Sequence, residues 1–249
     1  MTLPPLSPGQ WCLAVIAALC VGLAKGGFVG IGLFTIILMA EIAPARESTG
    51  LVLPLLICGD VFAVLMYRRH AQWKHIFRTL PVAMAGVVLG WIVMPRIPAD
   101  SFRKVIGWIL LTMIALQFLQ RLRPNAFRGV LESRGFGWSM GAWSGFTTML
   151  ANAAGPVMTL YLLAVNLPKL EFVGTGAWFF LVINAFKVPF SWQLGLIGGT
   201  SLALNLVLVP AVLAGLMVGR RLIALVPQKQ FEGILLVLAA LASLRLVAG

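Results

Sequence analysis

The sequence predicts an all-α integral membrane protein built from two inverted-topology repeats. Sixty per cent of its 249 residues are apolar and only 10% are charged, whereas a soluble domain has about 25% charged residues. The apolar runs are continuous, which favours helices over a β-barrel, where apolar and polar residues alternate along each strand. Two of the runs are interrupted near their middle. Paired interruptions in the two halves of a membrane protein indicate a central binding site.

The two halves have the same order of apolar runs. The first half opens with a run from about 11 to 40 that is broken at Lys25-Gly26-Gly27, which we call the first interruption. The second half opens with a run from about 138 to 165 that is broken at Asn152-Ala153-Ala154-Gly155-Pro156, the second interruption. Three continuous runs follow each, at about 48–67, 76–95 and 104–119, and at about 173–190, 195–219 and 230–247. We therefore expect each repeat to be a broken, re-entrant helical hairpin plus three transmembrane helices.

An internal match supports this organisation. Residues 81–102 align without a gap on residues 210–231, so that Gly86 pairs with Gly215 and Gly90 with Gly219 at a constant offset of 129. An offset of 124, which requires a small slip in register, pairs Asp60 with Asn184. We divide the chain into a first transmembrane repeat (1–120), a basic cytoplasmic linker (121–135) and a second transmembrane repeat (136–249).

The distribution of Lys and Arg indicates how the repeats are oriented. If each interrupted run is a hairpin, most Lys and Arg residues fall on one side of the membrane; if each is a single span, they divide almost evenly. Cytoplasmic loops hold the excess of positive charge, which favours hairpins and inverted repeats, with both termini on the extracytoplasmic side of the cell inner (cytoplasmic) membrane. As helices, residues 11–25 and 28–40 would each rise only about 20 Å, less than the roughly 30 Å hydrocarbon core.

Composition and motifs exclude several classes of protein. The net charge of +12 comes mostly from short loops between apolar runs, so we expect no nucleic-acid partner. The three cysteines lie inside apolar runs without CxxC spacing, and the two histidines have no third ligand nearby, so we expect no metal site. Nucleotide-binding and hydrolase motifs are absent from the sequence. We therefore expect neither a cofactor nor an enzyme.

The interruptions are the first candidate site. A helix that leaves an interruption presents unpaired N–H groups and partial positive charge, and small residues let an anion approach that backbone closely. The alternative is that the small residues only allow tight helix packing. The candidate residues are Gly26, Gly27 and Gly30 in the first half and Asn152, Ala153, Ala154 and Gly155 in the second.

Polar residues inside the apolar runs complete the candidate site, because burying such groups is costly. Lys25 stands at the first interruption and could balance a bound anion, unless it extends to a water-filled vestibule. Asp60 lies in the middle of a run and is a candidate for proton coupling. Asn184 and Lys187 lie one helical turn apart and so share a face. The alternative for Lys187 is that its side chain extends toward the membrane surface.

Several of these residues resemble the sulfite exporter TauE/SafE family. The resemblance includes the first interruption with Gly30-Ile31-Gly32, the second interruption, and Gly174-Thr175-Gly176 followed by Asn184-Ala-Phe-Lys187-Val-Pro189. It also makes Thr175 a candidate substrate-binding residue. The chain has Phe28-Val29 and Ile31 where the family tends to have glycines, and Ala154 where it has Gly-Gly-Pro, so the backbone is less open than usual.

The resemblance implies a function. The family exports small sulfur-containing anions such as sulfite or organosulfonates, and we expect a secondary transporter that works by alternating access around a midplane anion site. A passive anion channel and a non-transport membrane subunit are the alternatives. The expected partners are a small anionic substrate and the lipid bilayer. A homodimer stays open, because the faces of Gly86 and Gly90 suit either a dimer contact or internal packing.

Overall fold

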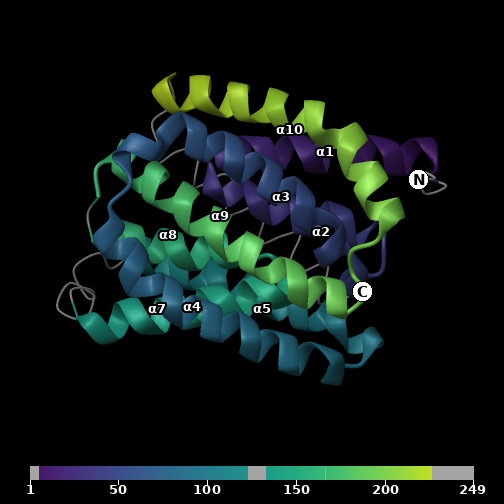
Figure 1. The fold of residues 1–249 in the computed structure, drawn as a ribbon, viewed down its shortest axis with the longest axis horizontal. Helices are drawn as coiled ribbons and strands as arrows, with labels where there is room; N and C mark the ends of the chain where they lie inside the picture. The colour runs from purple at the N-terminus through teal and green to yellow at the C-terminus, as the bar shows by residue number, and fades with distance from the viewer. Residues whose placement is uncertain (1–5, 123–132, 166, 226–249) are drawn as a thin grey trace.

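The computed structural model describes residues 6–122, 133–165 and 167–225, and the regular elements in these residues are all helices (Figure 1). Five of the described helices are long and apolar enough to cross a membrane: Pro8–Lys25, Ala45–His70, Trp73–Arg96, Lys169–Gln193 and Ser201–Leu222. The predicted class of helical membrane protein is therefore confirmed. The expected helix at 230–247 lies outside the described residues, as does most of the linker at 121–135.

The helices of both halves follow the predicted runs. The first half contains α1 (Pro8–Lys25), α2 (Gly32–Ala40), α3 (Ala45–Tyr67), α4 (Trp73–Val93) and α5 (Ala99–Leu122), with short 3₁₀ turns η1 (Val29–Ile31), η2 (Arg68–His70) and η3 (Met94–Arg96). The second half contains α7 (Arg134–Ala151), α8 (Ala154–Ala164), α9 (Lys169–Gln193) and α10 (Gly199–Leu225).

The arms of the first interrupted run differ in length, which corrects our expectation of two arms of about 20 Å. A capping box starts α1: the backbone N–H of Gln10 donates to Ser7 Oγ (3.3 Å), and Ser7 N–H donates to Gln10 Oε1 (3.0 Å). With Pro8 in the first turn, α1 reaches 18 residues, or about 27 Å, whereas α2 has 9 residues, or about 14 Å. The second run repeats this inequality, with 18 residues in α7 and 11 in α8.

Glycines bring α1 against α10 and α4 against α7 at the two edges of the bundle (Figure 1). An added Cβ would lie 2.0 Å from Val212 O at Gly22 and 2.2 Å from Ala142 O at Gly86. One turn further on, Gly26 of α1 contacts Gly219 of α10, and Gly90 of α4 contacts Met149 of α7. Both contacts move toward higher residue numbers on both helices, so α1 is parallel to α10 and α4 is parallel to α7. The faces of Gly86 and Gly90 therefore serve internal packing, which resolves the alternative left open by the sequence.

Between these edges, α3 and α9 cross in opposite directions (Figure 1). Gly50, near the start of α3, contacts Leu196 beyond the end of α9, and Gly174, near the start of α9, contacts Tyr67 at the end of α3. Both helices begin directly after a proline with extended backbone, Pro44 and Pro168, which stops the preceding segment from continuing as helix. Pro44 and Pro168 are themselves 124 residues apart.

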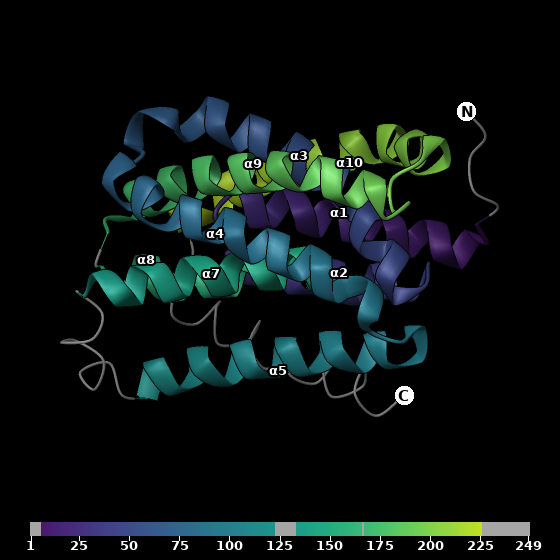
Figure 2. The same ribbon diagram turned by 60° about the horizontal axis from the view of Figure 1, so that its bottom comes forward.

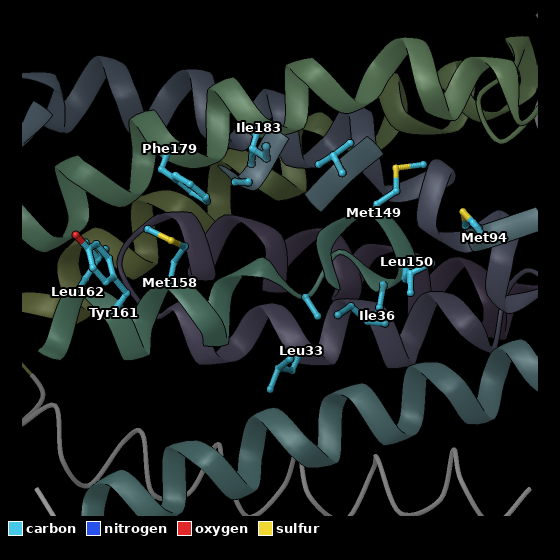
Figure 3. Close-up of a cluster of buried hydrophobic side chains, with 14 of the residues drawn as sticks. Leu33, Ile36, Met94, Met149, Leu150, Met158, Tyr161, Leu162, Phe179 and Ile183 are labelled. Atoms are coloured by element: carbon cyan, nitrogen blue, oxygen red, sulfur yellow. The ribbon is translucent and has the colours of Figure 1, made fainter. Parts of the chain in front are cut away.

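A hydrophobic core fills the space between α9 and the short helices α2 and α8 (Figure 3). Its labelled members include Ile36 of α2, Met158 and Leu162 of α8, and Ile183 of α9. Helix α5 lies along the outer side of α7 and α8 (Figure 2). On the outside of the bundle, α4 and α10 expose large apolar side chains such as Phe77 and Leu206, as expected for a surface that contacts lipid.

Candidate functional site

At the first interruption the chain turns back on itself. Gly27 has φ 125°, a left-handed conformation that glycine adopts without strain, and it lies two residues beyond Lys25, where α1 ends. The chain then passes through η1 into α2, where Thr35 Oγ1 donates a hydrogen bond to Ala17 O of α1 (3.3 Å). The two arms therefore form a helical hairpin whose turn carries Lys25.

The second interruption has the same form but a different turn residue. Asn152 ends α7 in the left-handed region (φ 52°, ψ 27°), where asparagine is one of the few tolerated side chains, and its N–H donates to Thr148 O (3.0 Å). Helix α8 begins two residues later, at Ala154. In place of the first interruption's flexible glycine, the second presents a polar amide at its turn.

Lys25, Asp60 and Asn184 meet where α3 and α9 cross. Lys25 Nζ lies 2.6 Å from Asp60 Oδ1, and Asn184 Nδ2 donates to Asp60 Oδ2 at 2.7 Å. The Asp60 side chain is fully buried, and the Lys25 ammonium also lies 4.6 Å from the centre of the Phe180 ring, a cation–π contact. The first interruption is thus fixed to the middle of α3.

Lys187 and Asn152 form the second group of contacts. Lys187 Nζ donates to Asn152 Oδ1 (2.5 Å) and lies 3.3 Å from Thr148 Oγ1. The amide of Asn152 faces both halves, because its Nδ2 donates to Thr49 O near the start of α3 (2.8 Å). We call the six side chains of these two groups the polar cluster: Lys25, Asp60, Thr148, Asn152, Asn184 and Lys187.

A cavity lies beside the polar cluster, between the two interruptions. Its volume of ≈ 70 Å³ is several times the roughly 10–15 Å³ that one water molecule needs, so it has room for a small anion. The polar side chains in its wall are those of Lys25, Thr35, Thr148, Asn152, Thr159 and Asn184. Most of the remaining wall is apolar, with Val29, Met158, Phe172 and Phe180 among its residues.

The structure brings most of the predicted residues to this cavity. Gly27, Ala154 and Gly155 line it with Lys25, Asn152 and Asn184. Asp60 and Lys187 lie directly behind the wall, each bonded to side chains that line it. Gly30 lies in η1, next to the lining residue Val29.

Three predicted residues have other contacts. Gly26 faces α10, where an added Cβ would lie 2.9 Å from the Cα of Gly219. Ala153 is fully buried, and its carbonyl accepts a hydrogen bond from Thr147 Oγ1 (3.3 Å). Thr175 Oγ1 accepts the N–H of Gln72 (2.9 Å), so it joins α9 to the start of α4.

The backbone donors differ from those expected at the first interruption. The N–H groups of Gly26 and Gly27 donate to Gly22 O (2.8 Å) and Ala24 O (3.2 Å), which ends α1 and corrects our expectation that they would be free for an anion. At the second interruption, Ala154 and Gly155 occupy the first turn of α8, where helix geometry leaves N–H groups without an intrahelical acceptor.

Among the lining residues that sequence reasoning missed, three lie one helical turn from a candidate: Thr148, Thr159 and Phe180. Thr148 precedes Asn152 by four residues, and Phe180 precedes Asn184 by four, so helical spacing places each on the same face as a predicted residue. Thr159 follows Gly155 by four residues on α8 in the same way. Extending each candidate by one helical turn would therefore have found all three.

The charges in the polar cluster do not balance. Asp60 is paired with Lys25, whereas among the described residues the hydrogen-bond partners of Lys187 are neutral oxygens. Lys187 is only 2% exposed. A buried cation without a counter-charge is costly, so an anion placed in the cavity would be stabilised.

Within the described residues, no group of three His, Cys, Asp or Glu side chains is placed to hold a metal ion.

Comparison with known proteins identifies a family. The family model for the sulfite exporter TauE/SafE matches residues 14–246, nearly the whole chain. No curated protein and no solved structure matches.

Proposed function

Because this chain belongs to the sulfite exporter TauE/SafE family, we propose that it is a secondary transporter that exports a small sulfur-containing anion such as sulfite or an organosulfonate. The family consists of multi-pass membrane transporters of sulfite and related sulfur anions, not of enzymes. The observation that supports an anion site most directly is the burial of Lys187 against neutral partners beside the cavity.

In this proposal the anion lies in the cavity between the two interruptions. The N–H groups of Ala154 and Gly155 donate to its oxygens, as helix N-termini do in anion sites. The side-chain amides of Asn152 and Asn184 offer further hydrogen bonds. Lys187 supplies the balancing charge through Asn152, and Lys25 keeps Asp60 neutralised.

We further propose that the two halves are inverted repeats that alternate access to this site. The opposite directions of α3 and α9 support inversion, because these helices are paired by the offset of 124. The offset of 129 pairs Gly86 with Gly215, and each packs on the first helix of the other half. Rocking of one half against the other about the crossing of α3 and α9 would expose the cavity to each side in turn.

We propose that the protein lies in the cell inner membrane with both termini outside. Arg68 and Lys169 lie at the same end of the bundle, since the end of α3 contacts the start of α9. Arg220 is close to Tyr67 at that end as well. This gathering of positive charge suits the cytoplasmic side. Arg46 and Arg96 lie at the opposite end. A homodimer would need a surface other than the faces of Gly86 and Gly90.

Transport by purified protein in liposomes tests the proposal. Labelled sulfite should accumulate when unlabelled sulfite is loaded on the opposite side, and Lys187→Met should abolish this exchange while the protein stays folded. Lys74→Met removes the same charge from an exposed site on α4 and should leave exchange unchanged. Sulfite flux without acceleration by sulfite on the other side would indicate the passive channel instead. Normal exchange by Lys187→Met would remove Lys187 from the site.

A further inference from the structure

With both lysines protonated and Asp60 ionised, the side-chain charges of the polar cluster sum to one positive charge. Two ammonium groups, Lys25 and Lys187, face a single carboxylate, Asp60, and their side chains are at most 10% exposed. Of the described residues that line the cavity, Lys25 is the charged one. A single negative charge on a bound anion therefore makes the buried site neutral.

A second negative charge has no partner at this position. Asp60 already engages Lys25 through Oδ1 and Asn184 through Oδ2, so the ammonium of Lys25 is paired before an anion arrives. Much of the cavity wall around the lysine and the amides is formed by apolar side chains such as Val29, Met158 and Phe172, which cannot stabilise a charge. A dianion would thus leave one unpaired charge in a medium of low dielectric constant.

From this balance we propose that Asp60 sets the charge of the cargo, so that the site selects monoanions over dianions of the same size. The proposal rests on the transport function proposed above and narrows it. Asp60 acts through Lys25 and Asn184 rather than by touching the anion. For sulfite itself, the bound form is then the singly charged hydrogensulfite, and doubly charged sulfonates are poor cargo.

Variants that change the charge sum one step at a time follow from this. Asp60→Asn raises the net side-chain charge of the polar cluster from +1 to +2. The double variant Lys25→Met/Asp60→Asn returns this charge to +1, which Lys187 alone then carries. The double variant removes the buried ion pair as a unit, so neither member of that pair is left without the other. Glu47→Gln removes an acidic charge from an exposed position in the first turn of α3 and serves as the matched control.

The test is the binding of three tetrahedral oxyanions to detergent-purified full-length protein, measured by titration calorimetry. Methanesulfonate and perchlorate carry one charge and sulfate carries two, at similar size. Wild type and Glu47→Gln should bind both monoanions at least tenfold tighter than sulfate. Asp60→Asn should shift that preference toward sulfate by at least tenfold, and the double variant should restore the wild-type preference.

Three outcomes overturn the proposal. Equal affinity of the wild type for methanesulfonate and sulfate would contradict it while sulfite exchange in liposomes still supported the transport function. An unchanged preference in Asp60→Asn, or a double variant that behaves like Asp60→Asn, would also contradict it. If Asp60→Asn does not fold, the double variant alone decides, because a preference for sulfate there is incompatible with a sum of +1. Absence of binding by any sulfur anion, sulfite included, would reject the transport function as well.

Discussion

Replacing Gly145 with alanine tests how closely the two halves are packed. The new Cβ would lie 1.8 Å from the carbonyl oxygen of Ala83 on α4, whereas ordinary contact begins at 3.4 Å, so the two backbones would have to separate by about 1.5 Å. Such overpacking costs about 3 kcal/mol at the upper end of its usual range, and the better helix propensity of alanine recovers about 1 kcal/mol. The net loss of about 2 kcal/mol should lower Tm by about 4–8 °C in a chain of this size.

The control lies on the same helix. An added Cβ at Gly135 meets nothing within 4 Å, so Gly135→Ala should melt at the wild-type temperature or slightly above it. Thermal unfolding of both variants in detergent, followed by tryptophan fluorescence, measures the difference. Gly22→Ala against Gly9→Ala repeats the comparison at the contact of α1 with α10. If Gly145→Ala and Gly135→Ala melt together, α4 and α7 do not approach as closely as the glycine contacts require.

Three further predictions concern single interactions. Lys25→Met leaves the carboxylate of Asp60 buried without its cation and should cost about 3–5 kcal/mol of folding free energy, which chemical unfolding would detect; stability equal to wild type would contradict the ion pair. Thr175→Val deprives the N–H of Gln72 of its acceptor and should cost about 1–3 kcal/mol of folding free energy without changing sulfite affinity. Weaker sulfite binding by a variant of wild-type stability would instead indicate that Thr175 binds the anion. Ser7→Ala removes the capping box of α1 and should lower stability by about 1 kcal/mol, an effect that Ser7→Asp should not show.

The sequence predicted the helices and the two interruptions that border the cavity, because both depend on local patterns. Continuous apolar runs require helices in a membrane, and a break in such a run shows in the sequence as small or polar residues. Lys25 and Asn152 were found in this way, and the structure places both at the cavity. The lengths of the two helices in the first interrupted run were harder to predict from the sequence. The start of α1 depends on the capping box of Ser7 and Gln10, which lies ahead of the apolar run.

Contacts between distant helices were the part that the sequence could not supply. Nothing in the local pattern around Gly26 distinguishes a residue that faces a ligand from one that faces Gly219 of α10. The bond from Gln72 to Thr175 likewise joins residues 103 positions apart. The offset of 124 was an exception, since it related Asp60 to Asn184 before the structure showed their side chains in contact.

The difference between Asp60 and Asn184 explains why the cluster has more cations than carboxylates. Were both positions aspartate, two carboxylates would face two lysines and the buried site would be neutral when empty. Asparagine at 184 keeps the shape and donates to Asp60, yet it carries no charge. One cation is therefore left over, Lys187, and the structure gives it neutral oxygens as its hydrogen-bond partners among the described residues. Asparagine rather than aspartate at 184 thus leaves this helix crossing with one more lysine than carboxylate, and the proposed anion would balance that charge.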